Sequence, residues 1–166
     1  MVPGAGFLLN NEMGDFNPGA GLTDATGRVG TAPNLVQPGK RMLSSMAPTI
    51  LVKAGKLFMV TGSPGGRTIP NTVLWTILGV VDFGLGAQAA VDAPRYHHQW
   101  LPDQLGYEKG RMPAAVGEAL QALGHTLLER PSQGCAQVIL MGPDGRPVGA
   151  ADGRWADSAA LAEVGP

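Results

Sequence analysis

Hydrophobic residues form short continuous runs near both ends of the chain, and these runs predict β-strands. The runs at residues 49–53 and 57–61 flank Ala54-Gly55-Lys56 and predict a β-hairpin, whose almost entirely apolar strands we expect to be covered on both faces. A second hairpin is predicted at residues 137–141 and 147–151, around the turn Pro143-Asp144-Gly145. Residues 7–10 predict one more short, buried strand, which ends at the polar pair Asn10-Asn11.

Between these strands the hydrophobic spacing changes to that of amphipathic helices. Pro70 falls in the first turn of the first helix, where proline is tolerated. Residues 87–92 predict a second, shorter helix, and Pro113 opens a third that ends before Gly124. The apolar stripe expected on the first helix is Val73, Leu74, Ile77, Leu78 and Val81. The stripe expected on the third is Val116, Ala119, Leu120 and Leu123.

The order of strands, helices and strands predicts an α+β fold with a mainly antiparallel sheet core. Residues 14–41 belong to neither kind of element, because they are rich in Gly, Pro, Asn and Thr and have no hydrophobic period. A loop of this length inside a compact domain is usually functional. We therefore expect residues 14–41 to form a functional loop or lid.

Composition excludes several classes of function. The 166 residues are enough for one domain. The 12 basic side chains nearly balance the 13 acidic ones and form no basic run, which argues against nucleic acid and favours a small molecule or a protein surface. No stretch approaches the roughly 20 apolar residues of a membrane span.

Cys135 is the single cysteine, which excludes an internal disulfide framework and a cysteine-rich metal site. Because Cys135 lies in the apolar run 135–141, we expect an inert core thiol. The first residues have neither the basic nor the apolar region of a signal peptide. Only a few residues precede the first predicted strand, so we expect the chain to be part of a longer protein.

An acidic pair, Glu12 and Asp15, follows the first predicted strand. Two carboxylates three residues apart converge if the chain turns at Gly14, and converging carboxylates hold a cation or perform acid–base work. A solvated loop is the alternative reading of this pair.

Two further groups offer hydrogen-bond donors to an anion. Ser44 and Ser45 lie before the strand at 49–53, where adjacent hydroxyls and backbone N–H groups can hold a carboxylate, although a pair of capping or turn serines is the alternative. Gly65 and Gly66 are the last two residues of the motif Gly62-Ser63-Pro64-Gly65-Gly66, at a predicted strand-to-helix junction. Exposed backbone N–H groups beside a helix N-terminus can stabilise an oxyanion, whereas the alternative is a plain turn.

The fourth group contains His97 and His98, with Asp92, Arg95 and Asp103 nearby. Adjacent residues of a strand point to opposite faces, so the two histidines cannot bind one metal ion unless the chain bends. We therefore expect no metal site, and instead a packed segment whose His and Arg side chains form hydrogen bonds.

In this order and spacing the four groups resemble the small, catalytic subunit of the γ-glutamyltransferase family, within the N-terminal-nucleophile hydrolases. The likeness runs from Gly6 to about Asp152. The motifs that carry the likeness include Gly6-Phe7-Leu8-Leu9-Asn10-Asn11-Glu12-Met13, Leu43-Ser44-Ser45-Met46 and Pro94-Arg95-Tyr96-His97-His98-Gln99-Trp100. Gly149-Ala150-Ala151-Asp152 is similar to the family's C-terminal Gly-Ala-(Ser/Ala)-Asp-Pro-Arg, with Gly153 in place of the proline.

The resemblance implies a four-layer αββα sandwich, formed by self-cleavage of a precursor, in a periplasmic or secreted enzyme. It implies that a new N-terminal threonine, with its own α-amine as base, takes the γ-glutamyl group of glutathione and passes it to water, an amino acid or a dipeptide. No metal or cofactor is implied. The matching positions assign the substrate's α-ammonium to Glu12 and Asp15, its α-carboxylate to Ser44 and Ser45, and the oxyanion hole to Gly65 and Gly66.

The sequence departs from the family pattern in three ways. No residue corresponds to the nucleophilic threonine, because the first threonine, Thr23, lies in the loop beyond the acidic pair. The large subunit, with its carboxylate-binding arginine, is absent. Residues 17–39 contain no aromatic side chain, which argues against an aromatic gate over the site. We therefore interpret residues 1–166 as a single partial domain, the C-terminal part of the small subunit, which is inactive alone and needs the large subunit of the same precursor.

Two other functions stay open at this point. One is a non-catalytic binder of γ-glutamyl compounds. The other is a related acylase that acts on the side chain of a β-lactam antibiotic. The acidic pair argues against the acylase, because a glutaryl-type side chain has no ammonium group for Glu12 and Asp15 to bind.

Overall fold

The computed structural model describes residues 3–161, which cluster into two compact units. The first unit comprises Met1–Ser44 with Trp100–Asp103, and the second comprises Ser45–Gln99 with Gln104–Pro166. The interpretation of the chain as a single partial domain stays a prediction. No helix among residues 3–161 has the length and apolar character needed to cross a membrane.

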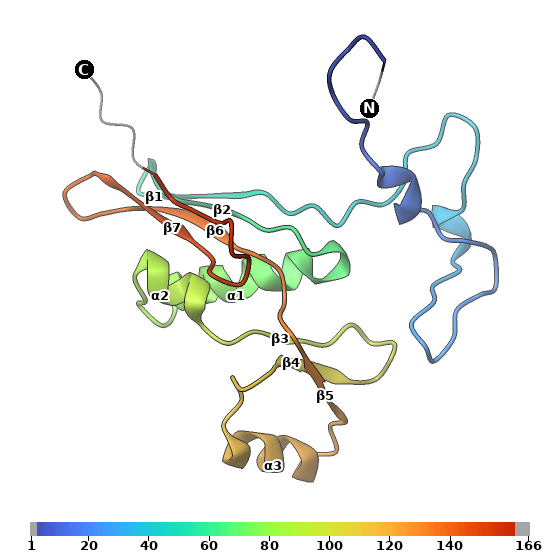
Figure 1. The fold of residues 1–166 in the computed structure, drawn as a ribbon. Coiled ribbons are helices and arrows are strands. Elements are labelled where there is room, and N and C mark those ends of the chain that lie inside the picture. The colour runs from blue at the N-terminus through green and yellow to red at the C-terminus, as the bar shows by residue number, and fades with distance from the viewer. Residues whose placement is uncertain (1–2, 162–166) are drawn as a thin grey trace. The chain divides into compact units, whose positions relative to one another are not determined.

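The second unit contains two β-sheets with helices beside them (Figure 1). Its strands are β1 Thr49–Lys53, β2 Lys56–Gly62, β3 Tyr96–His97, β4 Leu105–Glu108, β5 Leu127–Arg130, β6 Gln137–Met141 and β7 Pro147–Ala151. Its α-helices are α1 Ile69–Val81, α2 Ala87–Asp92 and α3 Ala114–Ala122. One sheet has the order β1-β2-β6-β7 and is antiparallel; the other, β3-β4-β5, pairs β4 and β5 in parallel. The predicted α+β class with a mainly antiparallel core is confirmed.

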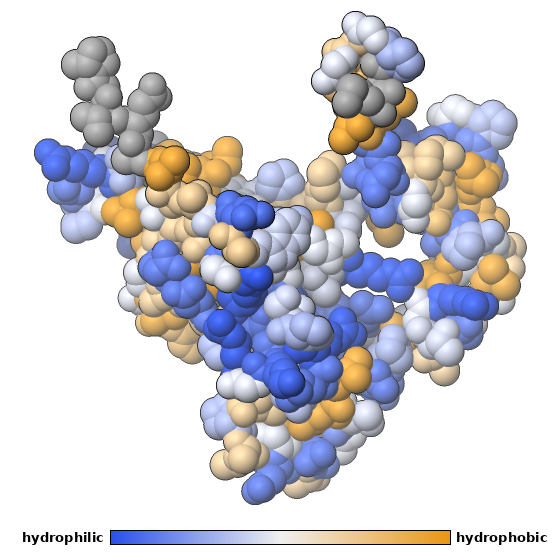
Figure 2. Space-filling model, in the orientation of Figure 1, coloured by the Kyte–Doolittle hydropathy of each residue, from blue (hydrophilic) through white to orange (hydrophobic). Residues whose placement is uncertain are grey.

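Both predicted hairpins are confirmed. The turn between β1 and β2 is Ala54-Gly55, and both residues have positive φ angles, 50° and 76°, as a tight two-residue hairpin requires. The expectation that β1 and β2 are covered on both faces is wrong for this chain. Ile50 and Val52 are 68% and 63% exposed, and Ile139 of β6 is 46% exposed. Helices α1 and α2 cover only one face of the four-stranded sheet (Figure 1), so these side chains of the opposite face reach the surface. Apolar residues are visible at the surface of the molecule in Figure 2.

The core of the second unit lies between the four-stranded sheet and the helices α1 and α2. Gly79 allows α1 to approach α2, because a Cβ atom at Gly79 would lie only 3.3 Å from the Cβ of Ala90. The fully or nearly buried apolar side chains of this core are Met59, Val138 and Ala150 from the sheet, Val80, Ala87, Ala90 and Val91 from the helices, and Ala136 directly before β6. This core resembles one sheet and one helical layer of the expected αββα sandwich.

The buried faces of two helices differ from the predicted stripes. Helix α1 buries Thr72 and Thr76, while Leu74 and Val81 are 48% and 53% exposed. Burial of the threonines is possible because the Thr76 hydroxyl donates to the Thr72 carbonyl at 2.9 Å.

Helix α3 has its predicted bounds, and Gly124 follows it with a φ of 93°. It buries only Gly117, so Val116 and Leu123 are 42% and 77% exposed. A Cβ atom at Gly117 would lie 3.2 Å from the Met112 sulfur, so the helix makes its close contact with Met112 at a residue that has no side chain.

The first unit has little regular structure, which confirms that residues 14–41 form a loop. The strand predicted at residues 7–10 is wrong: Phe7, Leu8 and Leu9 are 56–74% exposed and pair with no described strand. A strand needs a neighbour for its backbone hydrogen bonds, and without one an apolar run stays irregular. The loop is shaped by the 3₁₀ helices Glu12–Asp15 and Ala32–Asn34 and by a bridge between Asn17 and Leu35.

A buried network of four charges joins the two sheets of the second unit. Asp152, after β7, pairs with Arg95 at 2.7 Å and with Arg154 at 2.9 Å. Arg154 also pairs with Glu108 at the end of β4. All four side chains are at most 3% exposed. The network is neutral, and the arginines also donate to the carbonyl oxygens of Val91, Ala93 and Gln133.

The pKa values of these groups follow from burial and pairing. Burial alone would raise the pKa of Glu108 and of Asp152, but hydrogen bonds from Arg154 and from backbone N–H groups lower both below the ordinary range. Burial alone would lower the pKa of Arg154, but its hydrogen bonds to Glu108 and Asp152 raise it. Burial is also the main cause that lowers the pKa of Arg95.

We expect the second unit to unfold in acid. Because folding lowers the pKa of Glu108 and Asp152, the stabilisation that these carboxylates provide is fully present above their pKa in the unfolded chain, about 4. It is lost as the pH falls through their pKa values in the folded chain.

Glu108→Gln should reduce the free energy of unfolding at pH 7 by about 3–5 kcal/mol, because it leaves a buried guanidinium charge unbalanced. Urea unfolding followed by circular dichroism checks both effects. Asp144→Asn, in an exposed ion pair, is the control and should change stability by less than about 1 kcal/mol. Equal stability of the two variants would contradict this account.

We also expect residues 1–166 to self-associate through the face of the four-stranded sheet that α1 and α2 do not cover, because association buries exposed apolar side chains. Ile139→Lys should shift the sedimentation profile toward monomer. The same change at Leu123, an exposed residue directly after α3, should not. A monodisperse wild-type monomer would contradict the expectation.

Candidate functional site

The acidic pair lies on a single turn of 3₁₀ helix, Glu12–Asp15. Residues i and i+3 of such a turn lie on the same side, so Glu12 and Asp15 project from one side, as the sequence predicted for a turn at Gly14. The turn begins with a hydrogen bond from the Glu12 N–H to Asn10 Oδ1 at 3.1 Å. Both acidic residues are partly exposed, and neither carboxylate has a partner among the described residues. The turn therefore presents two carboxylates that a cationic group can use.

Asn34 connects this acidic turn to the segment that leads to Ser44. Its Nδ2 donates to the Asp15 carbonyl oxygen at 2.7 Å and to Asn17 Oδ1 at 3.2 Å. Its Oδ1 accepts the Leu43 N–H at 2.9 Å. Asn34 could not be predicted from the sequence, because nothing in the composition of the loop distinguishes it.

The serine pair lies in the irregular segment before β1. Ser44 is exposed and is the last residue of the first unit before the chain enters the second at Ser45, which is partly exposed. Their assignment to a substrate carboxylate stays a prediction.

The glycine pair lies between β2 and α1, as predicted. Gly65 and Gly66 have φ angles of 143° and 57°, which side-chain-bearing residues rarely adopt. The Gly65 carbonyl accepts from the Thr68 N–H at 3.2 Å and from the Thr68 hydroxyl at 3.0 Å, which fixes the turn. Both glycines are exposed, and no hydrogen bond joins their N–H groups to a described residue. These two N–H groups can therefore be donors to an oxyanion.

Ser63 fastens this turn to the start of β6. Its hydroxyl accepts the Cys135 N–H at 3.0 Å and donates to the Pro64 carbonyl at 2.7 Å. Cys135 is 1% exposed and is not in a disulfide, which confirms the prediction of a buried core thiol.

The histidine segment has the packing that the sequence predicted. His97 is buried and its Nε2 lies 2.9 Å from Gln99 Oε1, whereas His98 is exposed. Arg95 is buried in the charge network. Within residues 3–161, no three His, Cys, Asp or Glu side chains are grouped as metal ligands. Arg154 was missed, although the family pattern that ends in Asp-Pro-Arg contains a signal for it.

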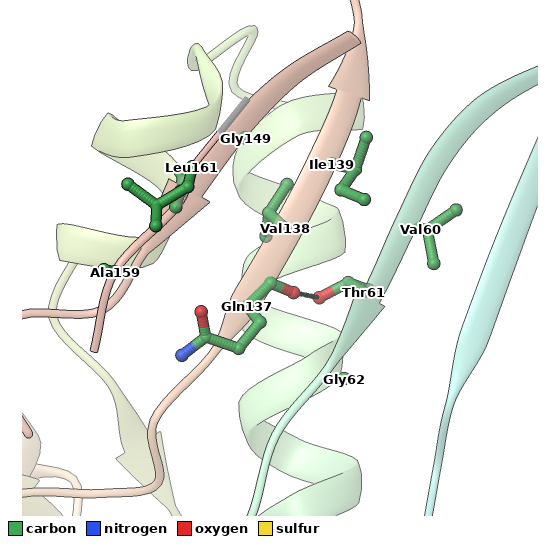
Figure 3. Close-up of a pocket in the computed structure, with 11 residues that line it drawn as sticks. Val60, Thr61, Gly62, Gln137, Val138, Ile139, Gly149, Ala159 and Leu161 are labelled. Atoms are coloured by element: carbon green, nitrogen blue, oxygen red, sulfur yellow. Dashed lines mark hydrogen bonds between the residues drawn. The ribbon is translucent and has the colours of Figure 1, made fainter. Parts of the chain in front are cut away.

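A hollow of about 420 Å³ lies on the face of the four-stranded sheet that α1 and α2 do not cover (Figure 3). It is lined by β2, β6, β7 and Ala159–Leu161, mostly with apolar and small side chains such as Val60 and Ile139. Thr61 and Gln137 are joined there by a hydrogen bond from the Thr61 hydroxyl to the Gln137 carbonyl at 3.0 Å. The hollow contains no charged residue and none of the six predicted site residues, so it does not fit an amino-acid head group.

The six predicted residues are divided between the two units. Glu12, Asp15 and Ser44 belong to the first, and Ser45, Gly65 and Gly66 belong to the second. The roles of these residues and their assembly into one site stay predictions.

Comparisons with known proteins agree on one family. The family model described as gamma-glutamyltranspeptidase matches residues 1–162. The glutathione hydrolase proenzyme of Escherichia coli (strain K12) is 48% identical over 153 residues, which are 92% of this chain and 26% of that protein. The chain thus spans about a quarter of the length of this relative.

Solved structures give the same result. A mutant gamma-glutamyltranspeptidase of Helicobacter pylori matches with a TM-score of 0.84 and 44% identity, over 93% of this chain and 85% of that chain. A cephalosporin acylase of Bacillus halodurans is a more distant likeness, with a TM-score of 0.73 and 29% identity over 80% of this chain and 25% of that chain. These matches confirm the predicted N-terminal-nucleophile hydrolase fold. The chain belongs to the gamma-glutamyltranspeptidase family.

Proposed function

We propose that this chain supplies the γ-glutamyl donor pocket and the oxyanion hole of a glutathione hydrolase or γ-glutamyltransferase. The observation that carries the proposal is the acidic turn, with two carboxylates on one side and no partner among the described residues. An α-ammonium group is a suitable ligand for such a pair, since charge-assisted hydrogen bonds to a carboxylate are among the strongest in proteins. Membership of the family and the 48% identity to an E. coli glutathione hydrolase proenzyme support the choice of substrate.

Each end of the donor has its own group of residues in this proposal. Glu12 and Asp15 bind the α-ammonium, and the hydroxyls of Ser44 and Ser45 bind the α-carboxylate. The γ-carbonyl then lies at Gly65 and Gly66, whose N–H groups donate to the oxygen as it gains negative charge. The exposure of these N–H groups at a glycine turn supports the assignment.

The attacking group comes from outside residues 1–166. In the proposed reaction a threonine hydroxyl of the same precursor forms an ester with the γ-glutamyl carbonyl, while the amide C–N bond breaks and the amine leaves with a proton. Water or an acceptor amine then breaks the ester and releases the threonine. The large subunit is the proposed partner, and the resemblance implies a periplasmic or secreted location.

The acylase alternative is less well supported. The likeness to the cephalosporin acylase, at 29% identity, is weaker than the likeness to the gamma-glutamyltranspeptidases, at 44%. The acidic pair also has no role with a side chain that lacks an ammonium group.

We predict that purified residues 1–166 release no product from a γ-glutamyl anilide, because positioning groups cannot replace a missing nucleophile. A chimaera in which residues 1–166 replace the matching segment of the E. coli relative should release the aniline. The two proteins are assayed side by side. Turnover by residues 1–166 alone, at a rate near that of the chimaera, would contradict the prediction.

In the chimaera, Asp15→Ala should lower kcat/KM for γ-glutamyl anilide on the order of tenfold to a few hundredfold, because it removes a contact worth roughly 1.5–3 kcal/mol. The glutaryl anilide, which lacks the α-amino group, should be nearly unaffected. Asp24→Ala is the matched control, since Asp24 is a carboxylate of the same unit that bonds locally to Thr26 and Arg28. Equal losses on the two donors would mean that Asp15 supports the loop and does not bind the amine.

A further inference from the structure

We propose that Asn34 is the positioning residue of the donor pocket, because its side chain sets the separation between the acidic turn and the segment that carries Ser44. The inference deepens the proposed function and rests on it. Asn34 contacts neither end of the donor; it acts through Asp15 and Leu43.

Three hydrogen bonds involve both N–H groups and the oxygen of the Asn34 side-chain amide. The two N–H groups of Nδ2 donate to the Asp15 carbonyl at 2.7 Å and to Asn17 Oδ1 at 3.2 Å, and Oδ1 accepts the Leu43 N–H at 2.9 Å. The orientation of the amide is fixed by these partners. The Asp15 carbonyl can only accept and the Leu43 N–H can only donate, so a flipped amide would lose both bonds.

The backbone of Asn34 is fixed as well. Its carbonyl accepts the Asn17 N–H at 2.9 Å, and its N–H donates to the Thr31 carbonyl at 3.3 Å. The side chain of Asn17 in turn donates to the carbonyl and the hydroxyl of Thr31 at 2.8 and 2.9 Å. Asn34 is therefore held at both its main chain and its side chain, and it can act as a fixed spacer.

The positions that Asn34 links are far apart in the sequence. Asp15 lies 19 residues before it and Leu43 lies 9 residues after it, in a segment without α-helices or strands. A loop of this kind does not keep its two ends in register by backbone stiffness. The amide of Asn34 replaces the missing secondary structure at this point.

A fixed spacing matters because of the chemistry of the proposed substrate. The α-ammonium and the α-carboxylate of a γ-glutamyl group are bonded to the same carbon, so their separation cannot change. The carboxylates of the acidic turn and the hydroxyl of Ser44 must match that separation together. A misplacement of about 1 Å in a substrate-positioning group can cost on the order of a hundredfold in rate.

The test uses the chimaera with three anilides: γ-glutamyl, glutaryl, which lacks the α-amino group, and 4-aminobutyryl, which lacks the α-carboxylate. Asn34→Ala should raise KM for the γ-glutamyl anilide at least about tenfold, with a much smaller change in kcat. The two truncated donors should lose less than about threefold, because each needs only one side of the pocket. Asn34→Ala added to Asp15→Ala should cost little more than Asp15→Ala alone.

Asn34→Asp is the second variant, in case Asn34→Ala does not fold. It has nearly the same size and keeps the acceptor for Leu43, but it cannot donate to the Asp15 carbonyl. Its loss should again be larger for the γ-glutamyl anilide than for the glutaryl anilide. Asp24→Ala, which removes local loop contacts of the same unit without touching Asn34, should leave the ratio of the two donors unchanged.

The outcomes separate this inference from the function on which it rests. A wild-type chimaera that hydrolyses the γ-glutamyl and glutaryl anilides equally well would overturn the proposed function and the role of Asn34 with it. A wild-type enzyme that prefers the γ-glutamyl anilide, with equal losses on all three donors in both Asn34 variants, would overturn only the role of Asn34. Wild-type kinetics in both variants would overturn it as well.

Discussion

The buried charge network of Arg95, Asp152, Arg154 and Glu108 is the interaction on which the second unit depends. It joins the end of β4 to the segment after β7, and it reaches the glycine turn through Gln133, whose N–H donates to Glu108 at 3.0 Å and whose carbonyl accepts from Arg95 at 2.8 Å. The next residue, Gly134, packs so closely against Ser63 and Thr72 that a Cβ atom there would lie 2.8 Å from both hydroxyls. A Cβ atom at Gly65 would in turn lie 3.3 Å from the Cα of Gly134, so close contacts run from the charge network to the glycine turn.

The first unit is held together by different forces. Its apolar residues Phe7, Leu8 and Leu9 are exposed, and its order comes from side-chain amides that bond to backbone groups. Gly27 marks one close approach in this unit, because a Cβ atom there would lie 2.9 Å from the Leu101 carbonyl and the Pro102 ring. Because this unit has no large apolar core, packing does not compensate for the loss of one hydrogen bond. We therefore expect the structure of the unit to be sensitive to substitution of Asn34.

The sequence predicted the parts of the fold that depend on local rules. Ala54-Gly55 and Pro143-Asp144-Gly145 define hairpins wherever two apolar runs flank them. The faces of α1 and α3 could not be predicted, because the close contacts are made by Gly79, Gly117 and two threonines, which carry little hydrophobic signal. The strands β3 to β5 have two to four residues each, too few to show a period. The six site residues were predicted from short motifs that match a family pattern. Asn34 and Glu108 could not be predicted in this way, because their partners are distant in the sequence.

The proposed function requires that this chain bind both charged ends of a γ-glutamyl donor. The most direct test is a crystal structure of the chimaera with L-glutamate bound. We expect the α-ammonium within hydrogen-bond distance of the Glu12 and Asp15 carboxylates, and the α-carboxylate at the hydroxyls of Ser44 and Ser45. Glutamate bound in the reverse orientation, or away from Asp15 and Ser44, would contradict it.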